Sequence, residues 1–188
     1  MYQICVSGAA KGDSVEEGKA LAQELGRAIA DAGHALMSGA TIGLPNYAAE
    51  AYKAAGGKMS VGISPASSKI EHVMKYRLPI EAYDSILYSG LHYVGRDTLL
   101  ITSSDAVVSI GGRIGTLHEF TIAIETDTPI GFLQGAGGVS EQIQSLMTLA
   151  HPLRTGAYVT FSESADELVK DLTHFLDKDH KKYHNLYQ

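Results

Sequence analysis

The chain has 188 residues, of which 45% are hydrophobic and 19% are charged, and its formal net charge is −6. This length is enough for one sizeable hydrophobic core and short for two. The acidic balance disfavours a surface that follows a nucleic-acid backbone. The one cysteine, Cys5, excludes an internal disulfide and a cysteine-based zinc site. No run is long and apolar enough for a membrane span or a secretory leader, so we expect a cytoplasmic protein.

The chain alternates between short apolar runs and segments with helical periodicity. In the first third, Ser14 and Glu17 have the spacing of a capping box, which predicts the start of the first helix. The expected elements here are a strand at 2–7, a small-residue loop at 7–13, a helix at 14–33, a strand at 35–38, a glycine-containing loop at 38–44 and a helix at 45–55.

The same alternation continues to the end of the chain. Residues 66–84 lack clean periodicity, and an irregular stretch of this length is often a functional loop. Ser164 and Glu167 predict the cap of the last helix. The further expected elements are strands at 59–64, 86–88, 106–110, 129–133 and 157–161, and helices at 93–102, from about 116, at 140–149 and at 164–176.

Strands that alternate with helices predict an α/β fold, a single Rossmann-like doubly wound parallel sheet with helices on both faces. We expect one domain over residues 1–177 and a charged C-terminal tail over 178–188. No metal site is expected, because His180 and His184 in the tail lack a convincing set of companion ligands.

The most informative stretch is 104–119, where an apolar β-branched run precedes a glycine-rich turn and a helix. The glycines allow a sharp turn and the close approach of a ligand. The unpaired N–H groups and the dipole at the start of the following helix favour the binding of an anion, so we expect a phosphate as the ligand. Glu119 lies about one turn into that helix, on the side of the same pocket. The alternative is a plain strand-to-helix turn with a favourable first-turn acid.

Three small-residue loops, at 7–13, 38–44 and 111–116, each follow a strand and can therefore meet at one edge of the sheet. Together they make room for a nucleotide or another phosphorylated ligand. The candidate phosphate- or nucleotide-binding residues are Ser7, Gly8, Gly39, Ala40, Thr41, Gly43, Gly111, Gly112, Arg113, Gly115 and Thr116.

Residues 103–119 resemble the "SDA…PGGxGTxxE" signature of the LOG family, formerly labelled lysine decarboxylases, in the SLOG superfamily of Rossmann-like nucleotide binders. Residues 38–44 resemble the family's "GGGxxGLM" loop, and residues 56–65 resemble its "GGxVIGIxP" strand. Arg96 falls at the spacing of the family's arginine. The resemblance extends from about residue 3 to about residue 175.

The resemblance implies a phosphoribohydrolase that cleaves the N-glycosidic bond of a nucleoside 5′-monophosphate, requires no cofactor and forms a homodimer or higher homo-oligomer. Glu119 matches the catalytic glutamate, which would stabilise the positive charge that develops on the sugar. Arg96 matches the catalytic arginine and would hold the substrate or the departing base. The alternative for Arg96 is a structural role, in which it pairs with Asp97 or with a helix-end carboxylate.

Four positions depart from the family pattern. Gly111 replaces the proline of "PGG", Arg113 replaces a glycine, Asp97 replaces the lysine of "RK", and His118 replaces the first acid of "EE". Arg113 either adds a phosphate contact or fills space that a nucleotide needs.

A second hypothesis is therefore a non-catalytic binding protein for a nucleotide or for the pterin phosphate of the molybdenum cofactor. The related carriers have a "GxxRN" motif that Gly95-Arg96-Asp97 resembles more closely than it resembles "RK". A DNA-binding relative is a third, less favoured class, because of the acidic balance. Tyr83, Tyr88 and Tyr93 are candidates for stacking on a base, although rim or interface positions are commoner for such residues.

Overall fold

The computed structural model describes residues 1–150 and 158–181. In these residues seven strands form one sheet. The strands are β1 (Gln3–Gly8), β2 (Ala35–Ser38), β3 (Ser60–Ser64), β4 (Ser85–Tyr88), β5 (Ala106–Ile110), β6 (Ile130–Leu133) and β7 (Val159–Ser162). The α-helices are α1 (Asp13–Asp31), α2 (Leu44–Ala54), α3 (His92–Thr102), α4 (Ile114–Glu125), α5 (Ile143–Ala150) and α6 (Ala165–Lys181), and two shorter turns are the π-helical η1 (Glu71–Lys75) and the 3₁₀-helical η2 (Val139–Gln142).

All neighbouring strands are parallel, in the order β4-β3-β2-β1-β5-β6-β7. The central β1 pairs with β2 on one side and β5 on the other, so that Cys5 lies opposite both Met37 and Val107. The chain therefore builds one half of the sheet outward from β1 to β4 and then returns to start the other half at β5. Ligands of such sheets bind beyond the carboxyl ends of the strands at this reversal, between β1 and β5.

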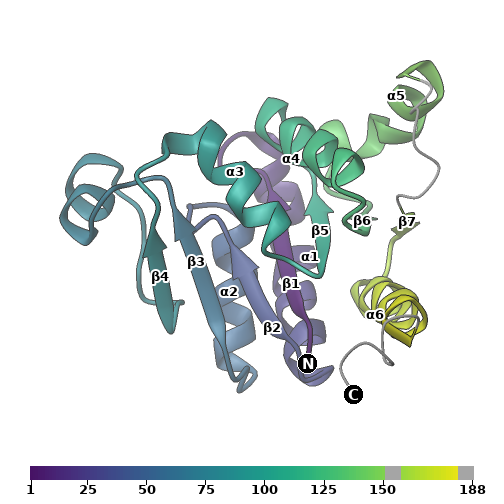
Figure 1. The fold of residues 1–188 in the computed structure, drawn as a ribbon, viewed down its shortest axis with the longest axis horizontal. Helices are drawn as coiled ribbons and strands as arrows, with labels where there is room; N and C mark the ends of the chain where they lie inside the picture. The colour runs from purple at the N-terminus through teal and green to yellow at the C-terminus, as the bar shows by residue number, and fades with distance from the viewer. Residues whose placement is uncertain (151–157, 182–188) are drawn as a thin grey trace.

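Helices cover both faces of the sheet, as predicted (Figure 1). On one face α1, α2 and α6 pack through residues such as Leu25, Tyr52 and Leu168. On the other face α3, α4 and α5 pack through residues such as Leu100 and Phe120. Every residue of β5 is buried, which confirms that this apolar run is a strand covered on both sides.

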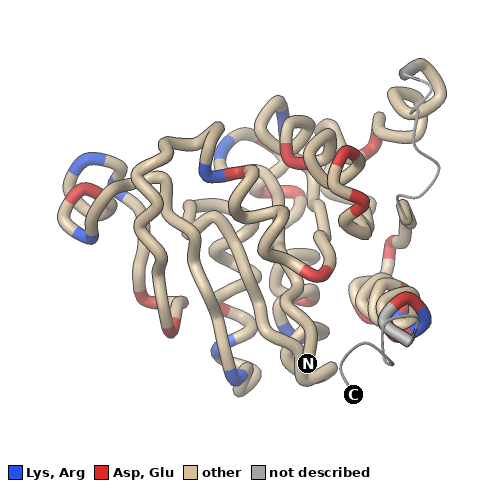
Figure 2. Tube along the Cα trace, in the orientation of Figure 1, with Lys and Arg blue, Asp and Glu red and all other residues tan. Residues whose placement is uncertain are grey.

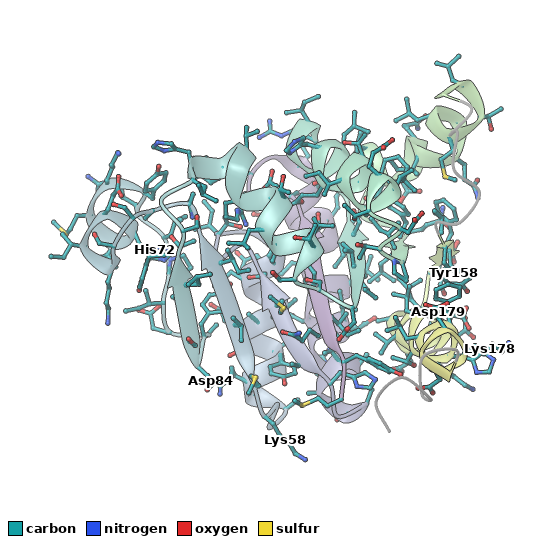
Figure 3. All side chains as sticks on the ribbon, in the orientation of Figure 1. Lys58, His72, Asp84, Tyr158, Lys178 and Asp179 are labelled. Carbon is teal, nitrogen blue, oxygen red and sulfur yellow. The ribbon has the colours of Figure 1, made fainter. Side chains whose placement is uncertain are left out.

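Charged residues concentrate on helices and loops, and the central strands are almost free of them (Figure 2). Lys58 and Asp84 precede β3 and β4 and lie at the amino edge of the sheet (Figure 3). Cys5 is buried, and burial raises the pKa of its thiol. No helix within residues 1–150 and 158–181 is both long and apolar enough to cross a bilayer.

Two predictions about helix starts have opposite outcomes. The capping box at Ser14 is wrong: α1 begins at Asp13, its N-cap is Gly12 with a φ of 97°, and no side chain caps it. Glycine adopts this backbone conformation readily, so the helix begins at Asp13 and Ser14 is already inside its first turn instead of capping it. The cap of α6 is confirmed, because the Glu167 N–H donates to Ser164 Oγ at 3.4 Å.

The last helix and the irregular segment also differ in detail from expectation. α6 extends to Lys181, so residues 178–181 of the predicted tail are helical, and 182–188 lie outside the described residues. His184 lies in that part. The segment 66–84 contains the turn η1, which projects beyond β4 at the side of the sheet (Figure 1).

Candidate functional site

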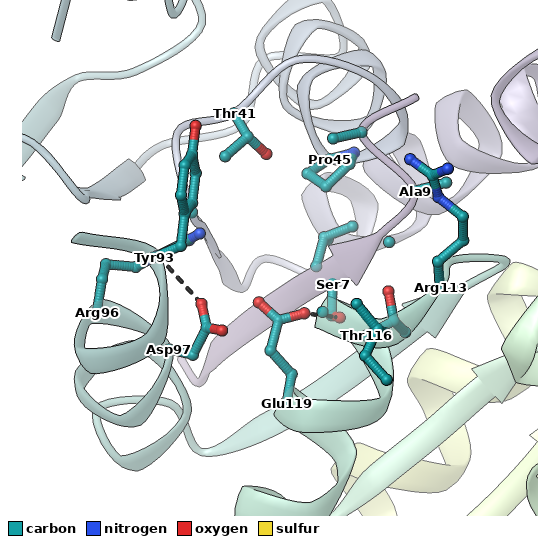
Figure 4. A pocket seen from close by; sticks show the side chains of 16 residues that line it. Ser7, Ala9, Thr41, Pro45, Tyr93, Arg96, Asp97, Arg113, Thr116 and Glu119 are labelled. Atoms are coloured by element: carbon teal, nitrogen blue, oxygen red, sulfur yellow. Dashed lines mark hydrogen bonds and ion pairs between the residues drawn. The ribbon is translucent and has the colours of Figure 1, made fainter. Parts of the chain in front are cut away.

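A cavity of about 510 Å³ lies at the carboxyl edge of the sheet, where β1 and β5 end. We call it the carboxyl-edge cavity. Its walls come from the end of β1, the β2–α2 loop, one face of α3 and the first turns of α4. Figure 4 shows Arg113 and Thr116 at one end of the view, Tyr93 and Arg96 at the other, and Glu119 between them.

The glycine-rich turn after β5 forms the end of the cavity near α4. Gly112 has a φ of 92°, and a Cβ there would lie 2.1 Å from Thr116 Oγ1, so the turn requires glycine. Ser140 Oγ donates to the Gly111 carbonyl at 2.5 Å and holds the turn from η2. α4 begins at Ile114, two residues earlier than predicted, and no side chain caps its N-terminus. Its first N–H groups are therefore available to an anion.

Glu119 and Ser7 form the floor of the cavity. Ser7 Oγ donates a hydrogen bond to Glu119 Oε2, and both side chains are buried. Burial, together with the negative charge of Asp97, raises the pKa of Glu119 from 4.5 to about 7, although Arg96 and the Ser7 hydrogen bond act in the opposite direction. The carboxyl therefore exists as a mixture of acid and carboxylate near neutral pH.

Arg96 and Asp97, both on α3, are also buried and line the cavity. Arg96 Nε lies 3.3 Å from Asp97 Oδ1, close enough for an ion pair, but it makes no hydrogen bond of acceptable geometry. Asp97 Oδ2 lies 3.0 Å from Nδ1 of His118, which comes from α4. The alternative in which Arg96 pairs with Asp97 thus agrees with the geometry.

The β2–α2 loop fits closely around the Arg96 side chain. A Cβ on Gly39 would lie 1.5 Å from Arg96 Nη1, so any larger residue there would force the guanidinium out of its present position. Gly43 has a φ of 82°, and a Cβ there would lie 2.4 Å from the Ala9 carbonyl oxygen. Ala40 is buried, has a φ of 50° and donates its N–H to Ser38 Oγ. These residues shape the loop.

The structure brings most of the predicted residues together. Those that line the cavity are Ser7, Gly8, Gly39, Thr41, Arg96, Arg113, Gly115, Thr116 and Glu119. Four do not line it and act only on loop shape: Ala40, Gly43, Gly111 and Gly112. Val6, Ala9, Ala10, Pro45 and Ile114 also line it and were not predicted. Ala9, Ala10 and Ile114 lie within the three predicted loops, and Val6 and Pro45 lie directly beside them, so their position in the chain and not their side-chain chemistry indicates these residues.

Of the three tyrosines considered for stacking, only Tyr93 lines the cavity. Tyr83 is buried and shares a hydrogen bond with Ser38, and Tyr88 packs edge-on against His72. Across residues 1–150 and 158–181, no group of three or more His, Cys, Asp or Glu side chains is arranged to hold a metal ion.

A doubly wound parallel sheet with its cavity at the strand-order reversal defines a Rossmann-like α/β protein. Residues 1–169 match the SLOG cluster4 family, and the chain belongs to that family. The superfamily expected from the sequence is thereby confirmed.

Similar proteins include carriers of the molybdenum cofactor. An uncharacterized protein of Archaeoglobus fulgidus is 31% identical over 134 residues, which are 71% of this chain and 81% of that protein. The X-ray structure of TM1055 has a TM-score of 0.79 at 26% identity, covering 93% of this chain and 99% of its own. The molybdenum cofactor carrier protein of Chlamydomonas reinhardtii has a TM-score of 0.74 at 26% identity, and the match covers 94% of this chain and 98% of the carrier.

Proposed function

We propose that the protein binds a phosphorylated heterocycle in the carboxyl-edge cavity, of the pterin phosphate type found in the molybdenum cofactor, and holds it without cleavage. The observation that carries this proposal is that both candidate catalytic side chains already have partners. Glu119 is bonded to Ser7, and Arg96 lies against Asp97. A carboxyl that is buried and partly protonated is poorly suited to stabilise a developing sugar cation.

The cavity suits such a ligand in size and in charge. About 510 Å³ is within the usual range of small-molecule sites. The N-terminus of α4 provides N–H groups for a phosphate, and the exposed Arg113 side chain supplies a positive charge at the same place. The similarity to the Chlamydomonas carrier along almost the whole of both chains supports the pterin phosphate over other phosphorylated ligands.

A phosphoribohydrolase is the second candidate, because Glu119 faces the middle of the cavity between Arg113 and Tyr93 (Figure 4). In this alternative the glutamate acts on a sugar C1′ next to a bound 5′-phosphate. Since the pKa of Glu119 is about 7, its carboxylate form predominates above pH 8, and hydrolysis would be fastest there.

Binding and cleavage are separated by one set of titrations. Inorganic phosphate, AMP and anaerobically prepared molybdopterin are titrated into the protein by calorimetry, and each mixture is then analysed by chromatography for released base at pH 6 to 9. We expect molybdopterin to bind and to be recovered intact, and AMP to release no adenine. Release of adenine that Glu119→Gln abolishes would establish the hydrolase instead. Failure of all three compounds to bind would overturn the proposal.

Arg113→Ala tests the phosphate end directly. We expect it to weaken molybdopterin binding roughly 10- to 100-fold, the usual range for loss of a charged hydrogen bond. Lys58→Ala is the matched control, because it removes one positive charge at the opposite edge of the sheet (Figure 3). Equal affinity of the wild type and Arg113→Ala would show that Arg113 does not hold the phosphate.

A further inference from the structure

An aromatic cluster forms the end of the cavity on the α3 side. Tyr93 lies in the first turn of α3, is 46% exposed and is the only aromatic residue among the described residues that line the cavity. The Tyr76 ring packs against it edge-on, with centroids 5.6 Å apart and an interplanar angle of 78°. The Arg96 guanidinium lies 5.9 Å from the Tyr93 ring centroid. Tyr93 therefore has neighbours that hold its ring and still exposes part of it.

The support for this ring extends one layer further. The Tyr76 hydroxyl lies 2.7 Å from His92 Nδ1 and shares a hydrogen bond with it, which ties the segment after η1 to the start of α3. His92 has a φ of 55°, so the backbone immediately before Tyr93 is left-handed. Residues in this conformation persist only where the surrounding structure holds them, and such positions cluster at ligand sites.

From this arrangement we infer that Tyr93 is a stacking platform for the planar ring of the bound heterocycle. The inference rests on the proposed function and adds the orientation of the ligand: phosphate at Arg113 and the N-terminus of α4, ring at Tyr93. Aromatic faces stack on any planar heterocycle, so the platform selects for a ring system and not for one particular base.

Two features of the cavity support this orientation. Figure 4 shows Tyr93 and Arg113 at opposite ends, with Glu119 between them, so a ligand with a phosphate at one end and a ring at the other spans the space. Thr41 and Pro45, which also line the cavity, have small or rigid side chains. A tyrosine that is already held loses little side-chain freedom on binding, which favours affinity.

The test compares ligands that carry a heterocyclic ring, a phosphate, or both. Ribose 5-phosphate carries the phosphate alone, adenosine and 6-hydroxymethylpterin carry the ring alone, and AMP carries both. We expect Tyr93→Ala to weaken AMP and pterin binding roughly 5- to 150-fold and to leave ribose 5-phosphate unchanged. Tyr93→Phe retains the ring and is expected to bind like the wild type. Pterin fluorescence should be quenched by the wild type and by Tyr93→Phe, and much less by Tyr93→Ala.

The outcomes separate this inference from the proposed function. If Tyr93→Ala weakens ribose 5-phosphate as much as AMP, or leaves all affinities unchanged, Tyr93 is not a ring platform. If the wild type fails to bind ribose 5-phosphate and yet quenches the pterin through Tyr93, the phosphate site fails and the platform stands. If neither the ring compounds nor ribose 5-phosphate bind, both proposals are wrong. Thermal melting of each variant checks that the fold is retained.

Discussion

The buried Glu119 should make the stability of the protein depend on pH in an unusual direction. Its pKa in the folded chain is about 7, against 4.5 for the ordinary group. Between these two values the native state holds a proton that the unfolded chain has lost, so stability falls as the pH rises through this window. Each unit of pKa shift corresponds to about 1.4 kcal/mol, so a rise in the pKa of Glu119 from 4.5 to about 7 corresponds to a loss of about 3 kcal/mol in unfolding free energy across this window.

Glu119→Gln removes this titration and retains an oxygen that accepts the hydrogen bond from Ser7. From pH 4 to pH 8 the unfolding free energy of the wild type should therefore fall by about 3 kcal/mol relative to that of the variant. Urea denaturation of both proteins at each pH measures this difference. Asp171→Asn is the control, because Asp171 is exposed on α6, far along the chain from the cavity. Parallel pH profiles for the wild type and Glu119→Gln would refute the reasoning, since the carboxyl would then titrate alike in both states.

Two further predictions concern the charge next to Glu119 and the packing of α1 on α2. Asp97→Asn removes the charge that, after burial, contributes most to the raised pKa of Glu119, so the pH window in which stability falls should end at a lower pH in the same urea titrations. If stability stops falling at the same pH in Asp97→Asn and in the wild type, this prediction is wrong. Gly26→Ala should destabilise the protein by about 1–3 kcal/mol in urea, although alanine normally favours a helix, because the added Cβ would lie 2.0 Å from the Ala48 carbonyl oxygen. Gly115→Ala is its control, because no atom beyond the chain neighbours and the backbone of its own helix lies within 4 Å of the added Cβ. A stabilised Gly26→Ala would show that the two helices separate at little cost.

The fold could be predicted from the sequence because the local and global signals agree. The strand runs are short and apolar, and β5 shows this most clearly, with all of Ala106–Ile110 buried. The boundaries were less predictable. Ser14 offered a plausible cap, but the positive φ of Gly12 starts α1 earlier, and a single sequence does not reveal which of two adjacent signals prevails.

The sequence predicted which loops form the candidate site, but only some of the side-chain contacts within it. Parallel strands bring their carboxyl ends to one edge, so three loops far apart in the sequence could be expected to meet. Which side chains touch depends on helix packing. The contact of Asp97 with His118 joins α3 to α4, and the passage of Arg96 over Gly39 joins α3 to the β2–α2 loop. These pairs are 21 and 57 positions apart in the numbered chain, and no local pattern relates them.

The direction of β1 has a practical consequence for handling the protein. β1 starts at Gln3 and ends at Gly8, beside the cavity, so its six residues separate the first residues of the chain from the cavity by about 20 Å. Met1 is exposed at the far edge of the sheet, where the N label stands in Figure 1. A sensor chip or affinity resin attached through Met1 would therefore leave the cavity facing the solution and open to the compounds under test.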